Sequence, residues 1–61
     1  MYILKFEDMN CWIAPWNGDP GRTLVRDSAR LFDTKEKAER FRKKTIQENS
    51  HREFNLVIEE F

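Results

Sequence analysis

The chain has little of what disulfide-bonded and metal-dependent proteins rely on. Its 61 residues include 1 cysteine, Cys11, and 1 histidine, His51. A single thiol cannot form an internal disulfide, and one cysteine with one histidine cannot complete the ligand set of a typical zinc site. We therefore expect no metal and no cofactor, and a lone thiol suits a cytoplasmic location.

Long apolar runs and an excess of one charge are also missing. No segment approaches the roughly 18 apolar residues of a membrane span, and MYILKFEDMN lacks the apolar stretch of a signal peptide. The 11 basic and 11 acidic residues cancel, so bulk charge gives no attraction to nucleic acid. A chain this short holds one core at best, which predicts a single domain over residues 1–61. The missing apolar run predicts no membrane association.

Catalytic residue constellations are missing as well. No motif places a nucleophile beside His51, and no recognisable basic partner would activate Cys11. Glu59 and Glu60 would point to opposite faces of a strand, so they cannot act as a pair. We expect a protein that is not an enzyme and has no catalytic residues.

What the sequence does contain is alternation of apolar and polar residues. It occurs in YILKFE at 2–7, in CWIAPW at 11–16 and in EFNLVIEEF at 53–61, and TLVR at 23–26 is a short β-like run. The positions predicted to share a face are Tyr2, Leu4 and Phe6, then Trp12, Ala14 and Trp16, then Phe54, Leu56 and Ile58. The first two segments make a predicted hairpin.

One segment, DSARLFDTKEKAERFRKKTIQENS, has helical periodicity. Asp33 or Thr34 would cap a helix over residues 34–47 that docks through Ala38 and Phe41. The order of elements predicts an α+β fold: a small antiparallel-rich sheet, β-β-(β)-α-β, with one amphipathic helix packed on one face.

The segment WNGDPGRTLV would either bind a phosphate or turn the chain. Residues 19–22 place Pro20 and Gly21 at the second and third positions of a type II turn, and the third position requires a positive φ. A phosphate-binding loop needs a lysine followed by serine or threonine, which the segment lacks. We interpret it as a turn, with an anion-binding nest that uses Arg22 as the alternative.

Several stretches together show a resemblance to a group of proteins. They are MYILKFED, GDPGRTLV, the spacing Ala29, Phe32, Thr34, Ala38 with a basic helix, and the final β run. In these features the chain resembles small uncharacterised proteins encoded in phages and prophages of Gram-positive bacteria. The resemblance implies the same α+β fold and carries no activity, cofactor or catalytic residue.

The aromatic residues have two interpretations. Phe6 and Trp12 share faces with Leu4 and Ala14, which favours packing in the core. With Tyr2 and Trp16 they would alternatively form a platform on which single-stranded nucleic acid stacks. Trp16 adjoins the loop that carries Arg22, so these two are candidate binding residues.

The basic run RFRKK at 40–44 is the second candidate. Residues 28–52 carry eight basic and four acidic residues, so charge is sorted along the chain although it cancels overall. The i,i+4 spacing predicts ion pairs of Glu36 with Arg40 and of Glu39 with Lys43. Arg42 and Lys44 would then be available to an outside partner.

The sheet face opposite the helix is the third candidate. Ile3, Cys11, Ile13 and Val57 would form an apolar patch there. A contiguous patch on so small a domain predicts a homodimer.

We therefore predict an accessory phage or prophage protein that binds a bacterial host protein. Its predicted partner-binding residues are Trp16, Arg22, Arg40, Arg42, Lys43 and Lys44. The alternative is a weak nucleic-acid-binding module that uses Arg40, Arg42, Lys43, Lys44 and Arg52.

Overall fold

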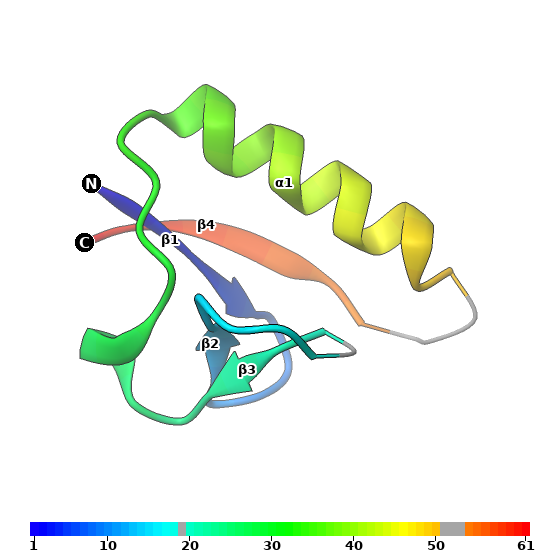
Figure 1. The fold of residues 1–61 in the computed structure, drawn as a ribbon, viewed down its shortest axis with the longest axis horizontal. Helices are drawn as coiled ribbons and strands as arrows, with labels where there is room; N and C mark the ends of the chain where they lie inside the picture. The colour runs from blue at the N-terminus through cyan, green and yellow to red at the C-terminus, as the bar shows by residue number, and fades with distance from the viewer. Residues whose placement is uncertain (19, 51–53) are drawn as a thin grey trace.

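The computed structural model describes residues 1–18, 20–50 and 54–61, in which strands form one antiparallel sheet and a helix crosses one face of it (Figure 1). The strands are β1 (Tyr2–Phe6), β2 (Trp12–Ile13), β3 (Arg22–Thr23) and β4 (Leu56–Glu60), in the spatial order β3-β2-β1-β4. The helix is α1 (Lys35–Glu48), and a 3-10 turn, η1 (Arg26–Ser28), follows β3. The predicted α+β fold class is confirmed.

Strand β1 is the centre of the sheet. Lys5 lies opposite Trp12 of β2 and opposite Val57 of β4, so the predicted hairpin of the first two strands is confirmed. Ile3 and Leu4 point to opposite faces, and both are completely buried. Both faces of β1 are therefore covered, one by α1 and the other by residues that follow β3.

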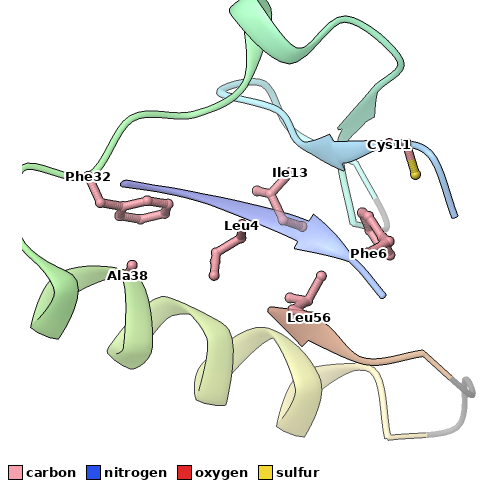
Figure 2. Packing of buried hydrophobic residues seen from close by; sticks show 7 residues of the cluster. All are labelled: Leu4, Phe6, Cys11, Ile13, Phe32, Ala38 and Leu56. Atoms are coloured by element: carbon pink, nitrogen blue, oxygen red, sulfur yellow. The ribbon is translucent and has the colours of Figure 1, made fainter. Parts of the chain in front are cut away.

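The main core lies between the sheet and α1. Figure 2 shows its buried members, which are Leu4, Phe6, Cys11, Ile13, Phe32, Ala38 and Leu56. The rings of Phe6 and Phe54 lie 5.5 Å apart, and those of Phe32 and Phe41 lie 5.3 Å apart. Core packing of Phe6 and docking of the helix through Ala38 are confirmed, whereas Phe41 is half-buried at the margin of the core.

A second, smaller cluster on the opposite face corrects the prediction for β2. Trp12 is buried as expected, but it packs with Ile3 and Ala29 on the face away from α1. The pairing of Trp12 with Lys5 explains this, because residues directly opposite in a sheet share a face, and Lys5 shares its face with Ile3. Cys11 and Ile13, which flank Trp12 in the chain, therefore face α1.

The predicted apolar patch is consequently wrong. Cys11 and Ile13 belong to the main core, and Ile3 is covered by Trp12 and Ala29. Of the four predicted residues only Val57 is exposed, with 41% of its surface accessible. The predicted homodimer, which depended on this patch, therefore has no support from it.

The chain between η1 and α1 crosses from one face of the sheet to the other along the edge of β1 (Figure 1). Tyr2 and Phe32 exchange two backbone hydrogen bonds of 2.8 Å, and the Arg30 N–H donates to the Ile13 carbonyl at 2.8 Å. Ala29 at one end of the crossing fills the second cluster, and Phe32 at the other end fills the main core. The crossing fixes Arg30 beside the helix.

The helix begins where the sequence predicts. The Thr34 hydroxyl accepts a hydrogen bond from the Lys37 N–H at 3.2 Å, so Thr34 is the N-cap. Asp33 instead accepts a hydrogen bond from the Lys37 ammonium at 3.1 Å, and this hydrogen bond holds the pKa of Asp33 below its ordinary value. At the other end the Asn49 side-chain amide donates to the Thr45 carbonyl at 2.9 Å, which satisfies a carbonyl of the last turn.

The loop between β2 and β3 needs its glycines for a different reason from the predicted one. The Ala14 N–H donates to the Gly21 carbonyl at 3.0 Å and closes the loop. Neither Gly18 nor Gly21 has a φ in the left-handed region, so the predicted positive φ at Gly21 is wrong. A Cβ on Gly21 would overlap the carbonyl oxygen of Trp16, which shows that close approach of the two sides of the loop excludes a side chain. Residue 19, the first of the predicted turn, lies outside the described residues.

A polar network ties the end of β4 to the second cluster. The Trp12 indole N–H and the Arg26 Nε both donate to Glu59 Oε1, each at 3.1 Å. The Arg26 guanidinium also lies 5.0 Å from the centre of the Phe61 ring. The hydrogen bond from Trp12, and after it the one from Arg26, lowers the pKa of the Glu59 carboxyl.

We expect this network to make stability depend on acid pH. Because the pKa of Glu59 is lower in the folded chain, the unfolded chain takes up the proton first as pH falls. The stabilisation is complete above the ordinary glutamate value of 4.5 and is lost as pH drops through the lowered value. Urea unfolding at a series of pH values measures this dependence. Glu59→Gln should flatten the profile of unfolding free energy against pH below the ordinary glutamate value of 4.5. An unchanged profile in the variant would contradict the assignment.

Candidate protein-interaction surface

The exposed side of α1 carries most of the candidate residues, and one flank forms a cleft with the crossing segment. We call it the aromatic-floored cleft; its volume is about 310 Å³ and it is lined by Arg30, Phe32, Lys37, Arg40, Phe41 and Lys44. Lys37, Arg40 and Lys44 lie three and four residues apart, so helical geometry places them on one side. The rings of Phe32 and Phe41, whose centres lie 5.3 Å apart, give the cleft an apolar floor.

Every ionisable residue that lines this cleft is a cation. The Arg30 guanidinium lies 4.7 Å from the centre of the Phe41 ring and 5.7 Å from that of Phe32. Such stacking on a ring face is favourable for a guanidinium and holds its position. Lys37 is paired with Asp33, whereas no acidic side chain in the described part of the chain pairs with Arg40 or Lys44.

The other flank of α1 faces β4 and forms a groove, which we call the edge groove. It measures about 600 Å³ and is lined by Lys35, Glu36, Glu39, Arg40, Lys43 and Ile58. Arg40 lies between the two hollows and lines both. Charges of both signs are present here, so the two flanks differ in character.

The ion pairs on this flank differ from the predicted ones. Glu39 accepts a hydrogen bond from the Arg42 Nε at 3.1 Å and a second, shorter one from Nη2. These bonds lower the pKa of the Glu39 carboxyl and raise the pKa of Arg42. The prediction that Arg42 is available is therefore wrong, because its planar guanidinium matches the carboxylate with two bonds where a lysine offers one point charge. Within residues 1–18, 20–50 and 54–61, Lys43 has no ion-pair partner, and Glu36 does not pair with Arg40.

Trp16 and Arg22 do not line the same hollow. Trp16 is 54% exposed and lines a hollow of about 420 Å³ between its loop and the C-terminal part of α1. The Arg22 guanidinium lies 5.0 Å from the centre of the Phe6 ring and is not part of that hollow. Because Phe6 and Trp12 are buried on opposite faces of the sheet, the alternative of a stacking platform for nucleic acid is wrong.

Sequence reasoning missed two cations of the cleft. Lys37 shares the helical spacing of Arg40 and Lys44, so a helical projection of the sequence would have found it. Arg30 reaches the cleft only because the crossing segment pairs with β1, which no local pattern indicates. Residues 51–53, with the candidate Arg52, lie outside the described residues.

Two further properties bear on the chemistry of the surface. No group of three or more histidine, cysteine or acidic side chains in the described residues could hold a metal ion, and Cys11 is buried. A helix with both the length and the apolar character of a membrane span is also missing from these described residues. The chain matches no protein family model, no curated protein and no solved structure.

Proposed function

We propose that this chain is a non-enzymatic accessory protein of a phage or prophage that binds an acidic surface of a bacterial host protein in the cytoplasm. The observation that carries the proposal is the aromatic-floored cleft, in which the four ionisable residues are all cations. The resemblance of the sequence to small phage and prophage proteins supports the setting.

The cleft combines charge with an apolar floor, which suits a protein partner. Arg30 is stacked on Phe41 and so presents its charge with little further loss of side-chain freedom. Arg40 and Lys44 are exposed and would steer an acidic partner toward the cleft. Phe32 and Phe41 offer an apolar floor to the partner. A protein surface that bears carboxylates also has apolar groups to place on this floor, whereas a phosphate backbone has none.

We expect the double reversal Arg40→Glu with Lys44→Glu to weaken partner binding by about tenfold or more, mainly through slower association. Stability should change by no more than about 0.5 kcal/mol per site, because both side chains are exposed. The partner is isolated from nuclease-treated bacterial lysate with the parent protein, and binding of the purified partner is then followed by surface plasmon resonance.

The matched control is Arg22→Glu, which reverses an exposed arginine on β3 outside the cleft. Its association rate should stay close to that of the parent. Equal binding by the double reversal and the parent would refute the cleft as the binding surface. If capture instead disappears with nuclease, and affinity falls by about 0.9 log units per log unit of salt for each phosphate neutralised, the chain is a nucleic-acid-binding module.

A further inference from the structure

Strand β4 ends the sheet on one side, and its backbone shows which groups face outward. The Glu7 N–H donates to the Asn55 carbonyl and the Phe61 N–H donates to the Met1 carbonyl, each at 2.9 Å. Since bonding alternates along an antiparallel pair, Val57 and Glu59 between them also face β1. The backbone N–H and C=O groups of Leu56 and Ile58 therefore point away from the sheet, as does the N–H of Glu60.

The C-terminal end of this edge is already closed. The Arg26 Nη2 donates to the Glu60 carbonyl at 2.8 Å, so that acceptor is occupied. Among the described residues no side chain or backbone group outside β4 bonds to the outward groups of Leu56 or Ile58. The opposite edge, β3, has 2 residues, so β4 with 5 residues is the longer template for another strand.

The edge groove lies beside these outward groups. Ile58 of β4 forms part of its wall, and Lys35 and Lys43 of α1 lie on the helix side. A strand added to β4 at the usual spacing of about 4.8 Å would direct every second side chain toward this groove. Of the acidic residues in the lining, Glu39 is already bonded to Arg42, which leaves the groove with a surplus of positive charge.

We propose that β4 accepts an extended acidic segment of the partner protein as a fifth strand, with alternate carboxylates placed on Lys35 and Lys43. The inference rests on the proposed function, because it names a second contact with the same acidic partner. Main-chain hydrogen bonds to Leu56 and Ile58 would supply the affinity, and the edge groove would select acidic side chains at every second position.

Amide hydrogen exchange measured by NMR tests this with a synthetic peptide of about ten residues in which glutamate alternates with valine. Exchange at the Leu56 and Ile58 amides should slow by about tenfold or more when the peptide is added, because these amides gain acceptors. The Val57 and Glu59 amides, which face β1, serve as internal controls and should not change. Two control peptides should leave exchange at the Leu56 and Ile58 amides unchanged. One has the same sequence with N-methyl groups on alternate residues, and the other has lysine in place of glutamate.

A pair of variants at one position separates the backbone from the side chain. Ile58→Pro removes the outward N–H, whereas Ile58→Ala keeps that N–H although it removes more of the apolar side chain. Peptide affinity should fall about tenfold further in the proline variant than in the alanine variant. If that variant fails to fold, the exchange experiment on the parent chain still decides the question.

Each other outcome has a definite meaning. Unchanged exchange at Leu56 and Ile58 overturns strand addition, and the proposed function stands if the double reversal of Arg40 and Lys44 still weakens host-partner binding. Protection of both amides without effect of that double reversal retains strand addition and rejects the cleft. Protection that rises with protein concentration in the absence of peptide would show that a second copy of this chain occupies the edge, which also overturns the proposed occupant.

Discussion

Replacing Phe6 with alanine should destabilise the protein by about 3 to 5 kcal/mol, the usual cost of removing a large buried aromatic side chain. Phe6 is completely buried in the main core and packs against Phe54. A chain of this length is expected to have a total stability of about 3 to 9 kcal/mol, so the variant would lose much or all of its folded population at room temperature. Urea or thermal unfolding followed by circular dichroism measures the loss.

The control for Phe6→Ala is Leu24→Ala, which removes an aliphatic side chain that is 80% exposed. Its free energy of unfolding should stay within about 0.5 kcal/mol of the parent. A Phe6→Ala protein that melts within a few degrees of the parent would mean that the sheet and α1 do not enclose this ring.

Gly21→Ala should cost about 1 to 3 kcal/mol, the range for forcing an extra carbon into a packed site. The added Cβ would overlap the carbonyl oxygen of Trp16, so the loop between β2 and β3 must shift to accept it. The melting temperature should fall by about 4 to 8 °C for each kcal/mol lost. The measurement is a thermal melt of the variant beside the parent.

The neighbouring substitution Arg22→Ala is the control, and the structure changes what we expect of it. The guanidinium lies over the Phe6 ring, so its removal should cost about 0.5 to 1 kcal/mol rather than nothing. If Gly21→Ala is no more destabilising than Arg22→Ala, close approach within the loop does not require glycine.

Both flanks of α1 illustrate how far the sequence leads toward a binding surface. Clustering of basic residues at 40–44 is visible in the sequence, and Arg40, Lys43 and Lys44 do lie on the exposed side of the helix. Which basic residue pairs with Glu39 is not visible in the sequence, because the spacing allows Glu39 to bind either Arg42 or Lys43. Side-chain shape decides between them, and the guanidinium of Arg42 makes the bidentate contact.

Local pattern alone determined β1, β4, the helix and its cap, whereas the predicted strand run at 23–26 is wrong, because β3 is Arg22–Thr23 and Arg26 begins a 3-10 turn. The alternation in residues 2–7 and 54–58 specifies strands with one apolar face, and Thr34 before a run of helix formers specifies where α1 begins, because these preferences act over a few residues. Tertiary structure decided the rest. A period of two says that Trp12 and Ile13 point to opposite faces but not which one meets the helix, and pairing of Trp12 with Lys5 settles it. In the same way, Arg30 joins the aromatic-floored cleft and β4 presents an open edge only through contacts between residues far apart in the chain.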